Sequence, residues 1–420
     1  MILAIGMCPP IGGPVLRPST LLDTRPALFR SEGGDPMPGD NNPLPHYDGR
    51  KLFLVGALII MGIAVGSSFG GEVGAIASSA WNVLPFTALA IFAYLGTRYP
   101  WAKVLALVIL VLTILGLSLC VVGVAMMAVI PEIFTQSDPE QAALMWGAVS
   151  ADQWLSVVKV GGGIGLAIII ASRGFIYRVR RAIAGLLPID PHSFVHTVAI
   201  TTVVALMLIF IVPLLILSGP PALVVADTIM ERLLAERGLG GLLLSDLYGL
   251  VWMIPASFLA VGCGVHRNFK EAAERLGLRL PTWRQAAVSM GLAVVLLLIV
   301  VILSQCIEWL WDSMDWPQTD MEAFEALMAP YLSPLGAIIL GVAAGLGEEL
   351  VVRGVLQPRL GIWLSNALFT SVHALQYNWD ALLVVFGLGM VCGVVRKKAN
   401  TTTSAIVHGM YNVLASVFDY

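Results

Sequence analysis

The chain has 420 residues, of which 58% are hydrophobic and only 12% are charged, with a formal net charge of −3. A soluble domain carries about 25% charged residues. The composition therefore excludes an ordinary soluble globular protein and indicates one that crosses a membrane several times. The small net charge does not suggest a nucleic-acid partner, and we expect none.

The first 50 residues differ in composition from the rest of the chain. They are rich in Pro, Gly and Asp, most densely over residues 33–43. Such a composition cannot bury a hydrophobic core, and we expect residues 1–50 to form a disordered cytoplasmic tail. We expect no cleavable signal either, because the apolar stretch Met1–Cys8 is short and no basic region precedes it.

Apolar stretches long enough for membrane helices follow through the rest of the chain. About 20 apolar residues cross a bilayer as an α-helix, and this length predicts an all-α polytopic membrane protein with about 11 transmembrane helices. The last three are short enough to be tilted or re-entrant. The predicted spans are 52–70, 79–97, 102–130, 154–172, 193–218, 241–264, 285–311, 333–354, 360–376, 380–395 and 403–418.

Charged residues in the loops support this set of spans. Basic residues follow the fourth, sixth and tenth spans, and acidic residues occupy loops on the other side. Loops rich in Lys and Arg remain on the cytoplasmic side, so every basic loop is cytoplasmic if the N-terminus is cytoplasmic. The basic residues are Arg173, Arg178, Arg180, Arg181, Arg267, Lys270, Arg275, Arg279, Arg284, Arg396, Lys397 and Lys398.

The distribution of polar residues divides the spans into two parts. Residues 51–284 are predicted to form an N-terminal transmembrane bundle of undefined role, without a polar constellation. Residues 285–420 are predicted to form the functional core, with its motifs within 333–418. The five cysteines lie far apart without the spacing of metal ligands, and they are interpreted as apolar packing residues.

Two adjacent carboxylates, Glu348 and Glu349, interrupt the apolar segment 334–353. A charged residue at the centre of a membrane helix costs about 2.5–3.5 kcal/mol on insertion scales, so such residues usually have a function. These two lie about 22 Å from the outer end of their helix. Glu349 and Arg353 have i,i+4 spacing and can pair, whereas Glu348 lies about 140° round the helix from Arg353. We expect Arg353 to hold Glu349 and to leave Glu348 free for proton chemistry.

Two further polar pairs follow, Phe369 with His373 and His408 with Asn412. Each pair has i,i+4 spacing, which places both members on one helix face. Such groups could activate water with Glu348 as general base and stabilise an oxyanion. The same groups could instead hold a zinc ion that polarises the water.

These groups must meet at one depth in the membrane. Counting helix rise places Glu348 and His408 about five residues from the cytoplasmic ends of their spans, but His373 about 20 Å from the inner end of its span. The ninth span must therefore begin later than residue 360 or be broken. Small-residue pairs at 341–345 and 389–393 would permit close helix packing.

In this order and spacing, the motifs resemble those of the CPBP family of intramembrane proteases, which includes the CAAX prenyl endopeptidases and many bacterial members. The family pattern is Glu-Glu-x-x-x-Arg, then Phe-x-x-x-His, then His-x-x-x-Asn or His-x-x-x-Asp. Residues 348–353, 369–373 and 408–412 match it at every motif position. The resemblance covers residues 333–418 and implies a helical catalytic core that opens to the cytoplasmic side of a bacterial cytoplasmic membrane.

The resemblance also implies roles for individual residues. Glu348 and His373 would activate the hydrolytic water, and His408 and Asn412 would bind the oxyanion or a metal ion. The implied substrate is a membrane-associated protein or peptide, of the CAAX type or another. Zinc held by His373, His408 and Glu348 is one expectation, and a metal-free glutamate mechanism fits the same residues. The supporting residues would be Glu349, Arg353 and Phe369.

Two other interpretations remain open at the level of sequence. Glu348 and Glu349 could form a structural ion pair with Arg353, one carboxyl being protonated. The chain could also be a non-catalytic scaffold or a proton-coupled transporter that uses the buried Glu/His cluster. Transporters usually have matching broken helices in both halves, and the first half of this chain offers no such polar helix. The sequence selects neither a substrate nor an oligomeric state.

Overall fold

The computed structural model describes residues 49–136 and 138–418. This part of the chain is all-helical and contains no β-strand, which confirms the all-α prediction. The predicted tail, residues 1–50, lies almost entirely outside the described residues. The helices of the first two thirds of the chain are α1 (Gly49–Ser67), α2 (Gly71–Ser79), α3 (Leu84–Leu95), α4 (Pro100–Val129), α5 (Pro131–Thr135), α6 (Pro139–Trp146), α7 (Ala151–Ser172), α8 (Tyr177–Ile183), α9 (Phe194–Leu217), α10 (Ala226–Ala260) and α11 (Phe269–Leu276).

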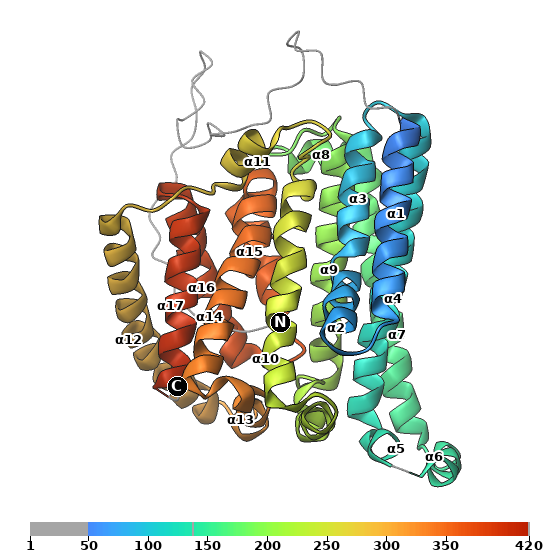
Figure 1. Cartoon of the computed structure of the whole chain (residues 1–420). Helices are drawn as coiled ribbons and strands as arrows, with labels where there is room; N and C mark the ends of the chain where they lie inside the picture. The colour runs from blue at the N-terminus through green and yellow to red at the C-terminus, as the bar shows by residue number, and fades with distance from the viewer. Residues whose placement is uncertain (1–48, 137, 419–420) are drawn as a thin grey trace, which may run out of the picture.

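The last third of the chain forms a compact group of helices on one side of the molecule (Figure 1). Its first helix, α12, lies at the edge of the group, and α14, α15, α16 and α17 lie together beside α10. A π-helical turn, Leu350–Leu356, joins α14 to α15. The helices are α12 (Trp283–Ser313), α13 (Met321–Met328), α14 (Pro334–Glu349), α15 (Gln357–Ser371), α16 (Trp379–Lys398) and α17 (Thr401–Val417).

Within the described residues, seven helices are long and apolar enough to cross a membrane, or eight if α2 and α3, bent by 49°, form one span. These helices identify an integral membrane protein. The predicted count of about 11 spans is not confirmed. Each predicted span does contain a helix, but α17 has only 17 residues and the apolar part of α1, Leu58–Ser67, is also short.

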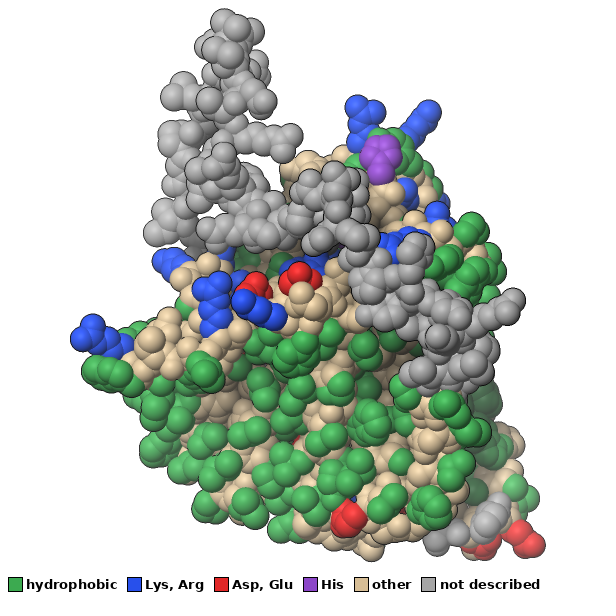
Figure 2. All heavy atoms as spheres, turned by 45° about the horizontal axis from the view of Figure 1, so that its top comes forward, with side chains coloured by type: hydrophobic (Ala, Val, Ile, Leu, Met, Phe, Trp, Pro, Cys, Tyr) green, Lys and Arg blue, Asp and Glu red, His purple; other side chains and the backbone are tan. Residues whose placement is uncertain are grey.

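The two ends of the helical bundle differ in charge. The short helices α8 and α11 lie at the upper end in Figure 1, and Lys and Arg side chains gather at that end in Figure 2. The short helices α5, α6 and α13 lie at the opposite end and carry acidic residues in their first turns. This segregation is the one that the loop charges predict.

The helices of the last third begin at capping side chains. Ser333 accepts a hydrogen bond from the backbone N–H of Gly336. Asn400 likewise accepts from the N–H of Thr403, at 2.8 Å. Each cap satisfies an N–H group that a helix start would otherwise leave unpaired, and unpaired groups are costly where water is scarce. The caps therefore define where α14 and α17 begin.

The ninth predicted span is broken at Gly361. This glycine has φ 74° and ψ 169°, a backbone conformation that ends the helix and that side-chain-bearing residues rarely adopt. The Arg353 guanidinium lies 5.3 Å from the centre of the Phe369 ring, although 16 residues of straight helix would separate the two positions by about 24 Å. The chain therefore reverses direction at Gly361.

The reversal at Gly361 removes the predicted mismatch in depth between Glu348 and His373. The descending arm begins at Ile362, so His373 lies about 16 Å below the start of its arm by helix rise. On the ascending arm, Glu348 lies about 18 Å below Leu360 by the same measure. The general base and the imidazole predicted from the motifs are thus carried on the two arms of one helical hairpin.

Glycines bring α14 and α17 into backbone contact. A Cβ atom on Gly345 would lie 2.6 Å from the Cα of Gly409, and one on Gly341 would lie 2.7 Å from the carbonyl oxygen of Gly409. No side chain larger than hydrogen fits at these positions without displacing a helix. The second glycine pair serves the hairpin, because a Cβ on Gly389 would overlap the side chain of Asn366.

The N-terminal bundle supports the descending arm. Ile200 and Val203 of α9 pack in one hydrophobic cluster with Leu368 of α15. Leu375, two residues after His373, belongs to the cluster formed by α4, α7 and α9, and its carbonyl oxygen accepts a hydrogen bond of 2.8 Å from the N–H of Ala222. The loop that carries His373 is therefore held by helices outside the predicted core.

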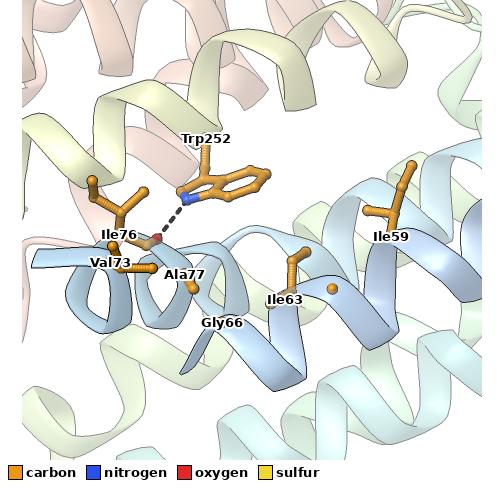
Figure 3. Close-up of a pocket in the computed structure, with 8 residues that line it drawn as sticks. Ile59, Ile63, Gly66, Val73, Ile76, Ala77 and Trp252 are labelled. Atoms are coloured by element: carbon orange, nitrogen blue, oxygen red, sulfur yellow. Dashed lines mark hydrogen bonds between the residues drawn. The ribbon is translucent and has the colours of Figure 1, made fainter. Parts of the chain in front are cut away.

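An apolar cavity of about 380 Å³ lies between α1, α2 and α10 (Figure 3). Its walls include Ile63 and Val73, and the Nε1–H of Trp252 donates a 2.7 Å hydrogen bond to the carbonyl oxygen of Ile76 at its edge. No titratable side chain lines this cavity. It therefore offers no groups for the chemistry that the motifs predict.

Candidate active site

The Glu349 carboxylate lies at the centre of the polar cluster. The Nε of Arg353 lies 3.3 Å from its Oε2 atom, and both side chains are fully buried, so the predicted i,i+4 pair is present. Ser404 of α17 donates a 2.5 Å hydrogen bond to the same oxygen. The other carboxylate oxygen lies 3.2 Å from Nδ1 of His408. Glu349 therefore links α14 to α17 as well as holding Arg353.

The contact with Glu349 sets the tautomer of His408. An ionised carboxylate can only accept hydrogen bonds, so the hydrogen of this contact belongs to Nδ1 of His408. We assign it from the hydrogen-bond network. In the neutral ring, Nε2 then carries a lone pair. It lies 4.0 Å from Oε2 of Glu348.

The backbone sets the tautomer of His373 in the same way. Its Nδ1 lies 2.7 Å from the carbonyl oxygen of Phe369, and a carbonyl oxygen only accepts. The hydrogen is therefore on Nδ1 and the lone pair on Nε2. Since the side chain is 1% exposed, this nitrogen is presented to a buried space.

Phe369 lies against both imidazoles. Its ring centre is 4.9 Å from that of His373 and 5.9 Å from that of His408, and both contacts are edge-to-face. The Arg353 guanidinium covers the ring at 5.3 Å. Phe369 therefore packs against both histidines of the motifs.

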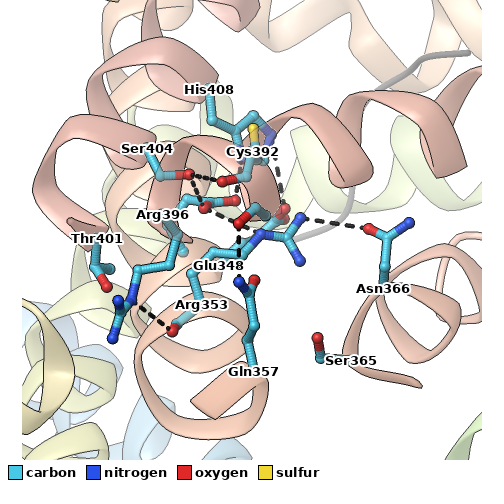
Figure 4. Close-up of polar contacts among 12 residues, drawn as sticks. Glu348, Arg353, Gln357, Ser365, Asn366, Cys392, Arg396, Thr401, Ser404 and His408 are labelled. Atoms are coloured by element: carbon cyan, nitrogen blue, oxygen red, sulfur yellow. Dashed lines mark hydrogen bonds and ion pairs between the residues drawn. The ribbon is translucent and has the colours of Figure 1, made fainter. Parts of the chain in front are cut away.

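Arg353 is held by groups from two further helices, α15 and α16. The Oδ1 atom of Asn366 accepts from its guanidinium at 3.4 Å, and the amide of Asn366 donates to the carbonyl oxygen of Phe386 at 2.7 Å. Arg396 donates to the backbone carbonyl oxygen of Arg353 at 3.3 Å. Figure 4 shows Arg353 between Ser404 and Asn366. This arrangement locks the ion pair in one geometry.

Glu348 has none of these restraints. Its side chain is 10% exposed, whereas those of Glu349, Arg353 and His408 are fully buried. Its Oε2 atom is buried without a hydrogen-bond partner among the described residues, as are Nε2 of His373, Nε2 of His408 and both side-chain polar atoms of Asn412. Buried polar groups are normally paired. Their unpaired state here indicates a site prepared for a water, a substrate group or an ion.

The four predicted catalytic residues therefore differ in how closely they approach one another. Glu348 and His408 come within 4.0 Å of each other, and His373 joins them through the ring of Phe369. Asn412 is buried one helical turn beyond His408 on α17. Their common feature is an unpartnered polar atom in the buried interior.

Two sets of residues bear on metal binding. In the described part of the chain, Glu349, Cys392 and His408 have ligand atoms within 4.8 Å of one another and could together hold a metal ion. The predicted set, Glu348, His373 and His408, does not meet that spacing. The carboxylate of the first set is already bound by the cationic Arg353 and by Ser404, which disfavours a second cation there. The predicted set fits a metal by its donors, because all three offer unpartnered atoms.

Three residues of the cluster were not predicted from the sequence. Ser404 lies four residues before His408, so its i,i+4 position was a usable signal. Cys392 has a backbone carbonyl that accepts from Ser404 at 2.9 Å. Asn366 carries no signal apart from its place on the same turn as Phe369. The interpretation of the cysteines as packing residues is wrong for Cys120 and Cys306, which are exposed on their helices.

The fold and the site together define an integral membrane protein with a buried carboxylate–imidazole centre. Residues 330–414 match the family model described as type II CAAX prenyl endopeptidase Rce1-like. This segment is therefore an Rce1-like domain, within the CPBP family that the three motifs indicate, and it contains all of them. The family supports a membrane endopeptidase. Comparison with curated proteins and with solved structures returns no match.

Proposed function

We propose that this protein is an intramembrane endopeptidase that cleaves a membrane-associated protein or peptide near the cytoplasmic face of the membrane. One observation carries the proposal: the unpartnered Oε2 of Glu348 lies 4.0 Å from the unpartnered Nε2 of His408 inside an Rce1-like domain. A merely structural carboxylate at this depth would be paired, as Glu349 is. We assign the catalytic core to residues 285–420 and a supporting role to the bundle at 51–284.

Glu348 acts as the general base in this proposal. Its carboxylate takes a proton from a water molecule while the water oxygen forms a bond to the carbonyl carbon of the scissile peptide. The lone pair on Nε2 of His373 accepts a hydrogen bond from the second O–H of that water and so orients the water molecule. When the carbon–nitrogen bond breaks, protonated Glu348 returns the proton to the leaving amine. The carboxylate is thereby regenerated.

Asn412 is the better oxyanion donor of the predicted pair. Its amide nitrogen carries hydrogens and has no partner among the described residues. His408 already donates through Nδ1 to Glu349, so it can donate from Nε2 only as an imidazolium. The Glu349 carboxylate would stabilise that charged form. Neutral His408 instead accepts a hydrogen bond from water or from protonated Glu348.

The donor atoms of the predicted set are of the kind that zinc binds, although their spacing in this structure is wider than that of a metal site. Glu348, His373 and His408 would hold the zinc ion through their unpartnered atoms, and zinc would supply Lewis-acid polarisation of the water. Metal analysis of the purified protein, with activity measured after chelation and re-addition of zinc, tests this point. Full activity in a metal-free preparation would remove zinc from the proposal.

The substrate class follows from the position of the site. We assign the basic end of the bundle to the cytoplasm by the positive-inside rule, with the N-terminus on the same side, and propose that the membrane is a bacterial cytoplasmic membrane. A peptide bond can reach Glu348 only when it is held at the membrane. We therefore propose proteins anchored to that surface as substrates, with farnesylated CAAX peptides as the first class to test.

The decisive experiment compares membranes from cells that carry the wild-type protein or a Glu348→Gln variant. Quantitative proteomics should reveal an uncut membrane-associated protein that accumulates with the variant. Glu308→Gln provides the matched control, because Glu308 is an exposed carboxylate on α12, and it should accumulate nothing. No accumulation with Glu348→Gln would sink the endopeptidase proposal and leave a scaffold or transporter role.

A further inference from the structure

The two rings of the second motif, those of Phe369 and His373, are followed one helical turn later by a third ring, that of Tyr377. Phe369, His373 and Tyr377 are spaced four residues apart. Their ring centres are 4.9 Å and 6.1 Å apart, and the rings of His373 and Tyr377 are within 20° of parallel. Although α15 ends at Ser371, the N–H of Tyr377 donates to the carbonyl oxygen of His373 at 3.0 Å. Tyr377 is thus held on the same face of the chain as the imidazole.

The hydroxyl of Tyr377 is buried without a partner. The side chain is 1% exposed, and the hydroxyl makes no hydrogen bond to any residue that the structure describes. Buried tyrosine hydroxyls usually find a partner. The ring is fixed on its other side by Phe324 of α13, at 5.0 Å between ring centres, so the hydroxyl cannot turn away to find one. Its position is imposed by packing.

The Tyr377 side chain lies beside the motif residues, since its ring stacks on that of His373, whose Nε2 is also unpartnered. Tyr377 packs in one cluster with Phe369 and with Tyr411, which lies one turn beyond His408 on α17. The unpartnered buried atoms of these residues are acceptors at Glu348, His373 and His408 and donors at Asn412 and Tyr377.

We propose that the Tyr377 hydroxyl is a further catalytic residue, which donates a hydrogen bond to the substrate carbonyl oxygen as that oxygen becomes an oxyanion. The inference rests on the proposed endopeptidase function. The proton stays on Tyr377 throughout, and no bond of the tyrosine is made or broken. Fixed donors aimed at a developing charge are most effective in a site that excludes water. Tyr377 and Asn412 would supply the two donors that such a site commonly needs.

The test removes one oxygen atom and keeps the ring. Tyr377→Phe should slow cleavage of the protein that accumulates with Glu348→Gln by about 10²-fold, the usual loss for one oxyanion donor. The decay of the uncut protein is followed in pulse-labelled cells. With purified enzyme and a peptide that spans the cleavage site, kcat should fall while KM stays unchanged, because the lost bond forms only in the transition state. The melting temperature should not move.

Tyr331→Phe is the matched control. The Tyr331 hydroxyl donates to Asp246 at 2.5 Å, about 25 Å along the helix direction from Glu348. Burial and the Asp246 carboxylate raise the pKa of Tyr331, so it is a neutral phenol like Tyr377. The control should cleave within about twofold of wild type, because the hydroxyl that it removes lies far from Glu348.

The outcomes separate the two proposals. Wild-type rates with Tyr377→Phe, in cells where Glu348→Gln still causes accumulation, would overturn only the role of Tyr377. A loss accompanied by a raised KM or a lower melting temperature would also overturn it, since those changes indicate a packing role. If Glu348→Gln causes no accumulation, the endopeptidase function fails and the role of Tyr377 fails with it.

Discussion

The N-terminal bundle and the last third of the chain use the membrane differently. In the most apolar 18-residue windows of α4 and α7, 28% and 22% of the residues are buried within the protein, against 61% in the corresponding window of the helical stretch 334–371. Apolar helices gain little by leaving lipid for protein, because lipid tails are equally apolar. Helices that carry carboxylates and imidazoles must be covered. The stretch that carries Glu348 and Glu349 is accordingly the most buried of the candidate spans among the described residues.

One helix of the N-terminal bundle, α9, does not follow this difference in burial. The window of α9 is 44% buried, the same share as in α16 of the core. This helix packs on the descending arm of the hairpin and, with α4 and α7, on Leu375. The comparison therefore separates a lipid-facing layer from a layer that supports the site, and the boundary falls inside the region 51–284.

The largest effect should come from breaking the buried ion pair. Arg353→Met leaves Glu349 charged and uncompensated, and the free energy of unfolding should fall by about 3–5 kcal/mol. Thermal unfolding in detergent measures this loss. Arg178→Met, at an exposed position of α8, should change the melting temperature little. Equal losses in both variants would contradict the difference in burial between the two regions.

A smaller effect should come from the helix contact at Gly345. Gly345→Ala forces a Cβ to within 2.6 Å of the Cα of Gly409, and such overpacking costs about 1–3 kcal/mol. It should also lower activity, because it moves His408 away from Glu348. Gly162→Ala, in α7, meets nothing within 4 Å and should be neutral or slightly stabilising. Calorimetry of the two variants side by side provides the measurement.

The smallest effect should come from the lipid-facing layer. Leu119 of α4 is 72% exposed, so Leu119→Ala should change the free energy of unfolding by less than about 0.5 kcal/mol. Leu388→Ala, at a fully buried position of α16, should cost about 2–5 kcal/mol. A costly Leu119→Ala would reveal a protein partner on that face instead of lipid.

Much of this arrangement could be predicted from local patterns. Apolar runs predicted the helices, and i,i+4 spacing predicted the Glu349–Arg353 pair, because both depend only on helix geometry. The reversal at Gly361 could not be predicted, since a single glycine in an apolar run is common and its φ is decided by packing. The contact of Glu349 with His408 joins residues 59 positions apart and depends on how α14 docks on α17.

Only part of the division of roles between Glu348 and Glu349 could be predicted from the sequence. Helix geometry separates Glu348 from Arg353, which is a local property. It could not show that Glu349 also orients His408, nor that Ser404 holds Glu349 in place. Both Ser404 and Tyr377 stand four residues from a motif histidine. Extending each motif by one helical turn would have found them.

The hairpin at Gly361 has a consequence for how the site is built. Its two arms meet over short sequence separations, as in the contact between Arg353 and Phe369, and short loops close at little entropic cost. The contacts of α17 with α14 span more than 50 residues and close at a higher entropic cost. The base and the first imidazole can therefore be in register before the second imidazole arrives. For the proposed endopeptidase, the catalytic site would then be complete only when α17 docks on α14.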